Sequence, residues 1–269
     1  KKQHFHLEPP RGLLNDPNGL SYFNGNFPLH IYIGGILEKQ QNYPAWERPA
    51  FLIAITMIGG YMNAYTYMTR DGILANMHTA NMSHLGISLA LGDWAGALLY
   101  FLPVLACISG AVFSQWLKKL VSTAGKKGDW RKKALVLEAA MLFAVGFVPA
   151  GTANIAVTVF ISFVMGFQLC LFRTCMGVAH NTTICTGNIR NVGQKLYGFL
   201  TTRDSRSFKT FFIFFILTFS FMIGAVPGTL ISIWLSERAV WVCSTALLLQ
   251  AMWMGSWEKR KSSVQNLNF

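Results

Sequence analysis

Long runs without a charged residue alternate with short clusters of charge along most of this chain. Four such runs, at 49–69, 94–117, 210–236 and 239–257, contain 19 to 27 residues each. A helix of about 20 apolar residues crosses the hydrocarbon core of a bilayer, which is roughly 30 Å thick. The pattern therefore predicts a membrane-spanning helix at each of these positions.

A fifth run, between Glu138 and Arg173, contains 34 uncharged residues. As one helix it would be about 51 Å long at a rise of about 1.5 Å per residue, which is too long for a single span. Pro149, Gly151 and Asn154 lie near its middle and favour a break. We therefore predict two helices there, at 134–150 and 153–173. The expected fold is an all-α membrane bundle with about six spans.

Two further uncharged segments, 72–92 and 174–189, are rich in Asn, Thr, His and Gly. They are too polar to face lipid and too apolar for ordinary loops, so we predict that both re-enter the bundle. They also contain a repeat, because TANMSHLG at 79–86 aligns with TGNIRNVG at 186–193, 107 positions later.

The same offset of 107 carries three predicted helices of the first half onto the second half. Residues 49–69 align with 156–176, 94–117 with 201–224, and 134–150 with 241–257. Because the layout of the helices also agrees at this offset, the match between the two short motifs is poorly explained by chance. We predict two repeats, at about 49–150 and 153–257, followed by a basic tail at 259–269.

Composition and charge support a membrane location. Apolar residues make up 52% of the chain and charged residues only 13%, whereas about 25% is usual in soluble domains. The net charge of +12 comes from basic blocks between apolar runs, which argues for lipid head groups as the partner and against nucleic acid.

The basic blocks also predict the orientation of the chain. Lys and Arg are concentrated at 118–133, 201–209 and 259–261, and such clusters stay in the cytoplasm. Both termini are then cytoplasmic, and the two repeats are inverted relative to each other. Inverted repeats with polar, interrupted segments near the midplane are typical of secondary transporters. A duplication that serves only structure is the alternative.

Polar side chains inside these segments are the candidate site residues, because a polar group in hydrocarbon needs a partner or a water-filled cavity. The pocket or pore candidates are Asn63, Asn76, Thr79, Asn81, Gln168, Asn181, Thr186 and Asn188. We expect Asn81 and Asn188 to act as paired ligands of an unidentified small solute, with Asn63 and Gln168 along the path. In the competing interpretation, these Asn and Thr residues cap short helices or bond across helix contacts.

Four titratable groups complete the candidate set. His78, His84 and His180 can change protonation near neutral pH, but packing or loop roles are the stronger expectation. Glu138 follows a basic cluster, so we expect it to reach the interface or to pair with Lys132 or Lys133; a proton relay is the alternative. No metal or cofactor is expected, because no CxxC pair occurs among the five cysteines. The sequence is compatible with a homo-oligomer.

Motifs in the main body resemble a known family. GGYMNA at 59–64 followed by ANMHTAN at 75–81, and MGFQ at 165–168 followed by TGN at 186–188, resemble the G-x-x-D-A … T-G-N pattern of the YoaK-like family, domain of unknown function 1275. The resemblance covers about residues 48–258 and implies a multi-pass bacterial inner-membrane protein without an assigned activity. The chain departs from the pattern at Asn63, where an acid is common, and at Ala80, where Gly is usual.

The beginning of the chain resembles a different family. HFHLEPPRGLLNDPNGLSYFNG at 4–25 is similar to the start of glycoside hydrolase family 32, the sucrose-6-phosphate hydrolases and invertases. That resemblance makes Asp16, preceded by Asn15, the position of the nucleophile. Retaining glycosidases need a second carboxyl group about 5–5.5 Å away.

The family's other catalytic signatures are missing from this chain. Arg70-Asp71 and Arg203-Asp204 are not followed by proline, and no Glu-Cys pair occurs. We therefore read 1–35 as an inactive fragment and 36–48 as a linker, and we expect no cleavage of sucrose or sucrose-6-phosphate.

Overall fold

A computed structural model describes residues 43–123, 130–151 and 154–267 of the chain. The side chains of 122–123 and of 259–267 are not among the described parts. The predicted glycosidase-like fragment, with Asn15 and Asp16, lies outside the described residues. So does most of the predicted linker at 36–48.

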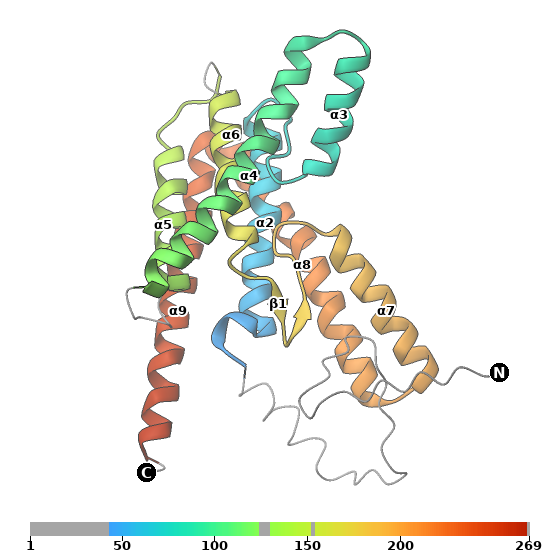
Figure 1. The fold of residues 1–269 in the computed structure, drawn as a ribbon, viewed down its shortest axis with the longest axis vertical. Coiled ribbons are helices and arrows are strands. Elements are labelled where there is room, and N and C mark those ends of the chain that lie inside the picture. Colours follow the sequence, from blue (N-terminus) through green and yellow to red (C-terminus); the bar gives the residue numbers. More distant parts are fainter. Residues whose placement is uncertain (1–42, 124–129, 152–153, 268–269) are drawn as a thin grey trace, which may run out of the picture. The chain divides into compact units, whose positions relative to one another are not determined.

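The described chain is almost entirely helical (Figure 1). The elements in chain order are η1 (Ala45–Glu47), α2 (Pro49–Thr69), α3 (His78–Ala90), α4 (Trp94–Thr123), α5 (Trp130–Val145), α6 (Asn154–Leu169), β1 (Thr174–Cys175), β2 (Val178–Ala179), α7 (Thr186–Thr202), α8 (Ser205–Leu235), η2 (Ser236–Ala239) and α9 (Val240–Leu267).

The six predicted helices are confirmed as helices, although α4 continues to Thr123 and α9 to Leu267, beyond the predicted ends at 117 and 257. The long uncharged run is broken as expected, because α5 ends at Val145 and α6 begins at Asn154. Two helical stretches, Trp94–Val121 and Ser205–Glu258, are long and apolar enough to cross a membrane. The second consists of α8, η2 and α9 as far as Glu258, and α6 is a shorter apolar helix.

One departure from an all-helical chain follows α6. Thr174 pairs with Ala179 in an antiparallel two-stranded hairpin. Met176 and Gly177 at its tip both have positive φ, of 49° and 78°, as a tight hairpin turn requires. The Met176 N–H donates to the carbonyl of Glu47 at 3.1 Å, so this hairpin lies beside the start of α2.

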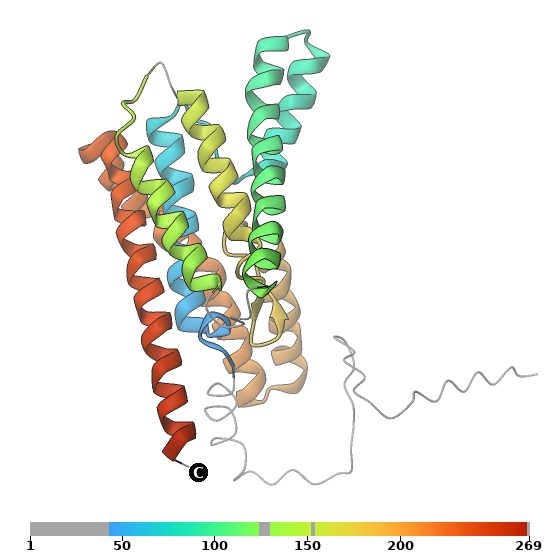
Figure 2. The same cartoon turned by 60° about the vertical axis from the view of Figure 1, so that its left-hand side comes forward.

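The helix contacts are symmetric between the two halves of the chain. α2 packs on α8 as α6 packs on α4, α3 packs on α4 as α7 packs on α8, and α5 packs on α9 (Figures 1 and 2). If α2, α3, α4 and α5 are exchanged for α6, α7, α8 and α9, in that order, the same pairs of helices are in contact. Each first helix of one half is thus held by the third helix of the other half.

Glycines permit close helix contacts at two places. At the α2–α8 contact, a Cβ on Gly60 would overlap the carbonyl oxygen of Phe221, and one on Gly224 would overlap that of Met57. At the α4–α6 contact, Gly110 and Gly166 are packed against backbone carbonyls in the same way. Small residues of this kind let helix backbones approach closely.

The shorter helices α3 and α7 begin in the middle of the bundle and run toward opposite ends (Figure 1). Both polar segments that precede them reach the centre of α2, as the contacts below establish. These are the two segments that the sequence predicts to re-enter the bundle.

Candidate functional site

A stripe of small and polar residues follows one face of α2. Thr56, Gly59, Asn63 and Thr66 are spaced three and four apart, which puts them on one side of a helix, and all four are buried. We call these four residues the α2 stripe. It lies within a 21-residue helix that is otherwise mostly apolar, so its polar groups need partners from elsewhere.

The first polar segment, between α2 and α3, supplies some of these partners. The Ala75 N–H donates to the Thr66 hydroxyl at 3.3 Å, and the Asn76 amide donates to the Gly59 carbonyl at 3.1 Å. On the other side, the Ser162 hydroxyl of α6 donates to the Ala75 carbonyl at 2.8 Å. The segment is therefore held between α2 and α6.

The second polar segment, between β2 and α7, approaches the same stripe. His180 Nε2 and the Thr56 hydroxyl are hydrogen-bonded at 3.2 Å. The backbone of Thr182 and Thr183 lies directly against Gly59, where a Cβ would overlap the Thr182 carbonyl oxygen. The two segments, about 107 positions apart in the sequence, thus meet at Gly59.

Several buried polar atoms around this junction have no hydrogen-bond partner in the described structure. They are Asn63 Oδ1, Asn76 Oδ1, His180 Nδ1 and Thr182 Oγ1. Most buried polar groups in proteins are satisfied, so a group of orphaned atoms calls for an explanation. A polar ligand that bonds to hydroxyl, amide and imidazole groups is one such explanation. The described residues hold no cluster of three His, Cys, Asp or Glu that could bind a metal ion.

Asn81 and Asn188 make equivalent bonds within their own segments. The Asn81 amide donates to the Leu74 carbonyl at 3.3 Å, and the Asn188 amide donates to the Asn181 carbonyl at 2.6 Å; both bonds reach back seven residues. The Asn188 side-chain oxygen also accepts from the Asn181 N–H at 3.0 Å. Both side chains are thus used to shape the turn that precedes a helix.

Other predicted residues lie apart from this junction. Gln168 on α6 is fully buried, and neither atom of its amide has a hydrogen-bond partner. Thr79 and Thr186 are exposed. The residues preceding α3 and α7, Met77 and Cys185, make no side-chain cap. Solute binding by these candidates stays a prediction.

The histidines occupy three different environments. His180 is buried at the α2 stripe, whereas His84 is exposed and stacks on Tyr100 with ring centroids 4.8 Å apart. Both ring nitrogens of the half-buried His78 are without a partner. The three side chains therefore share no common site.

The expectation for Glu138 is wrong. We predicted that its side chain reaches the membrane interface or pairs with Lys132 or Lys133. The side chain is instead fully buried, and neither carboxyl oxygen has a hydrogen-bond partner. Glu138 follows Ala134 by four residues and therefore falls on the buried face of α5 that packs on α9. Lys132 lies against Gly255 instead.

Four buried polar residues that contribute to this junction were not among the candidates predicted from the sequence. The four missed positions are Thr56, Thr66, Ser162 and Thr182. The three- and four-residue spacing of polar residues along 56–66 was a signal that could have indicated the stripe. Ser162 and Thr182 carry no such pattern, because their role depends on a contact between distant segments.

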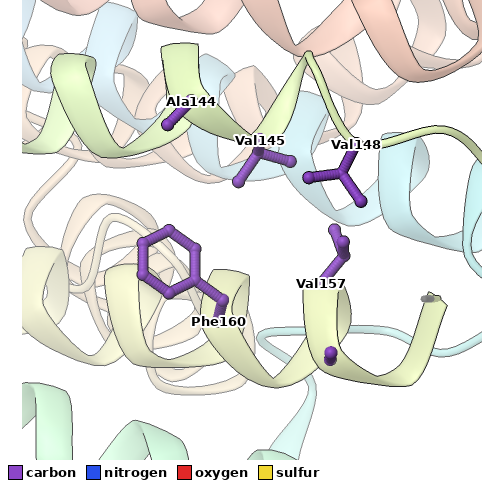
Figure 3. Close-up of a pocket in the computed structure, with 6 residues that line it drawn as sticks. Ala144, Val145, Val148, Val157 and Phe160 are labelled. Atoms are coloured by element: carbon purple, nitrogen blue, oxygen red, sulfur yellow. The ribbon is translucent and has the colours of Figure 1, made fainter.

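A surface pocket of about 260 Å³ lies elsewhere, between α5 and α6 (Figure 3). Aliphatic and aromatic side chains line it, namely Ala144, Val145, Val148, Ala156, Val157 and Phe160. Binding sites for polar ligands need a few placed polar groups. This pocket has none among its lining side chains, so we do not include it in the candidate site.

The comparison with protein families decides the affiliation of the main body. The family described as "Protein of unknown function (DUF1275)" matches residues 51–253. The chain belongs to the DUF1275 family. The resemblance predicted for 48–258 is confirmed over that range, and the α2 stripe and both polar segments lie inside it. The family description assigns no activity. No solved structure is significantly similar.

Two curated proteins are similar only to a short stretch. The sucrose-6-phosphate hydrolase of Streptococcus mutans is 72% identical over 25 residues, 9% of this chain and 5% of the hydrolase. That of Bacillus subtilis is 55% identical over 31 residues, 12% of this chain and 6% of the hydrolase. The predicted glycosidase resemblance is confirmed, and the chain matches about a twentieth of each enzyme. Matches this short do not support hydrolase activity.

Proposed function

We propose that this DUF1275 member is a multi-pass inner-membrane protein in which two inverted repeats hold a binding site for a small, uncharged polar solute. The observation that carries the proposal is the meeting of both polar segments at Gly59, halfway along α2. Three further sets of observations support it: the surface of the long helices, the distribution of charge, and the repeat symmetry.

The surface of α4 suits a lipid environment. Large apolar side chains are exposed along one face at intervals of three or four residues, namely Leu98, Phe101, Leu105, Ile108, Val112, Trp116 and Leu120. From first to last this face is about 33 Å long at about 1.5 Å per residue, close to the roughly 30 Å of a bilayer core. Contiguous apolar surface on this scale is unusual for a soluble monomer.

The two ends of the bundle differ in charge. At one end, Arg131 donates to the Leu171 carbonyl at 3.0 Å, which brings the start of α5 beside the end of α6 and the basic residues near it. At the other end, Tyr65 donates to the Glu237 carbonyl at 3.0 Å, and the nearby Arg70 is buried. This asymmetry supports a cytoplasmic location for the first end.

The solute class follows from the groups at the junction. Hydroxyl, amide, imidazole and backbone carbonyl groups meet there, and no Lys, Arg, Asp or Glu is among those described. Such a set suits hydrogen bonds to an uncharged polar molecule. Because Thr182 is packed against Gly59, a solute enters only when this contact opens. We propose that opening alternately toward the two sides is the transport step.

Thr182→Val tests solute binding most sharply. Valine keeps the shape of threonine and removes a buried hydroxyl that has no partner, so the empty protein should be equally or more stable. We expect the purified full chain to gain thermal stability from a member of a panel of polyols, sugars and amides. In Thr182→Val, the solute concentration that gives half of this stabilisation should be at least ten times higher than in the wild type. Thr245→Val, at an exposed position of α9, should leave that concentration unchanged.

A structural or regulatory membrane protein is the alternative. It predicts no response of the wild type to any neutral, anionic or cationic solute, together with no flux in proteoliposomes. That combination of results would contradict the proposed binding site. A response to charged solutes alone would contradict the proposed solute class.

A further inference from the structure

Glu138 lies on the face of α5 that packs against α9. Its side chain is 0% exposed, and both carboxyl oxygens lack a hydrogen-bond partner. Buried neighbours on the same face of α5 are Ala134, Leu135, Ala139, Leu142 and Val145. The Ser244 hydroxyl of α9 donates to the Ala139 carbonyl at 2.7 Å, so α9 lies directly beside this carboxyl.

No side chain on the surrounding helices of the described chain hydrogen-bonds to the Glu138 carboxyl. On α9, Cys243 is buried, and on α2 the Tyr61 hydroxyl donates to the Ala239 carbonyl, so neither of these groups supplies a positive charge. α6 has no titratable side chain between Asn154 and Leu169. The titratable residues of α4 are Tyr100, Cys107, Lys118 and Lys119.

Arg131 and Lys132, two of the cations of α5, have other neighbours. Arg131 donates to the Leu171 carbonyl, and Lys132 lies against Gly255. No hydrogen bond joins Glu138 to any cation of the described chain. A carboxylate buried without a partner is very costly, whereas a protonated carboxyl group is tolerated much better.

We propose that Glu138 is a proton-binding site whose proton keeps α5 packed against α9. When the carboxyl is protonated it is neutral, and the two helices close over it. When the proton leaves, the carboxylate must gain water or a cation, and the α5–α9 contact loosens. The charge balance is simple: one proton passes from the carboxyl to solvent, and one negative charge remains. This inference does not depend on the solute site at Gly59.

Carbodiimide labelling of the purified full chain tests the protonation directly. Dicyclohexylcarbodiimide enters apolar regions. A protonated carboxyl adds across its C=N bond, with the carboxyl oxygen on carbon and the proton on nitrogen, and the resulting O-acylisourea rearranges by an oxygen-to-nitrogen acyl shift to a stable N-acylurea. We expect labelling of Glu138, measured by peptide mass spectrometry between about pH 5 and about pH 9, to decrease as the pH rises. A water-soluble carbodiimide should instead label Glu237, which is only partly buried.

Thermal unfolding over the same pH range tests the link to packing. The wild-type midpoint should fall as the pH rises, whereas Glu138→Gln, which resembles the neutral carboxyl in size, should show a flat profile. Glu237→Gln should keep the wild-type profile. Absence of labelling, labelling independent of pH, or the same pH dependence in wild type and Glu138→Gln would each overturn the proposal. If Glu138→Gln fails to fold, the wild-type labelling profile still decides.

Discussion

The guanidinium of Arg70 donates to the side-chain oxygen of Asn154 at 3.1 Å, although 84 positions separate the two residues. The same guanidinium also donates to the carbonyls of Val148 and Pro149, and the Asn154 amide donates to Asp71 at 2.8 Å. This cluster fastens the end of α2 to the connection between α5 and α6. It holds α2, the first helix of the N-terminal half, beside α6, the first helix of the C-terminal half.

Asn154→Ala should therefore destabilise the protein substantially. The change removes an acceptor from a fully buried cation, and hydrogen bonds to charged groups contribute about 1.5–3 kcal/mol each. We expect a loss of about 2–3 kcal/mol in the free energy of unfolding, measured by denaturant titration in detergent micelles. Gln194→Ala, at an exposed position of α7, is the control and should change little. Equal effects of the two changes would contradict this account of the cluster.

The glycine contacts give a second prediction. Gly60→Ala should disrupt the α2–α8 packing, because the new Cβ would overlap the Phe221 backbone, and overpacking of this kind costs about 1–3 kcal/mol. Gly86→Ala is the matched control, since a Cβ there meets nothing within 4 Å and alanine favours the helix. Thermal midpoints should fall for the first variant and stay or rise for the second. A harmless Gly60→Ala would mean that the two backbones are not in close contact.

The sequence predicted the helical framework well and the site only in part. Uncharged runs and helix-breaking residues near Pro149 located the helices, because the length of an apolar run and the position of breakers are local properties. The repeat at 79–86 and 186–193 also identified the two segments that lead to Gly59. These features need no knowledge of which helices touch.

Contacts between distant segments were not predictable in the same way. Arg70 stands at the end of an apolar run, and the sequence gives no sign of its bonds to Val148, Pro149 and Asn154, which lie 78 to 84 positions away. Glu138 was expected to meet nearby lysines, since the sequence does not reveal which face of α5 packs on α9. Ser162 and Thr182 were missed for the same reason.

The turns before α3 and α7 should differ in their sensitivity to mutation. Asn188 makes three hydrogen bonds with the preceding segment and Asn81 makes one, and each is expected to contribute about 1 kcal/mol. Asn188→Ala should therefore lower the thermal midpoint more than Asn81→Ala. Asn191→Ala, which removes a single exposed bond to Ala179, should have the smallest effect. The reverse order would contradict the described bonding.

Asp204 should make α8 sensitive to acid. Its carboxylate accepts the Ser207 N–H at 2.6 Å and the Ser207 hydroxyl at 3.2 Å, and this bonding lowers the pKa of Asp204 below its usual range. Asp204→Ala should cost about 1 kcal/mol, as loss of an N-cap does. Because the pKa of Asp204 is lowered in the folded state, the difference in the free energy of unfolding between wild type and Asp204→Ala should have its full size above about pH 4. It should disappear as the pH falls through the lowered pKa, which unfolding curves at stepped pH can follow.

The most direct test of the inverted-repeat arrangement is the side of the membrane on which two turns lie. Leu91→Cys and Ser205→Cys mark the exposed ends of α3–α4 and α7–α8, each made in a chain whose five native cysteines are replaced. An impermeant maleimide applied to intact cells from which the outer barrier has been removed should label Leu91→Cys. Ser205→Cys should react only after lysis. Labelling of both positions from the same side, or recovery of the polypeptide in the aqueous fraction without detergent, would contradict the account.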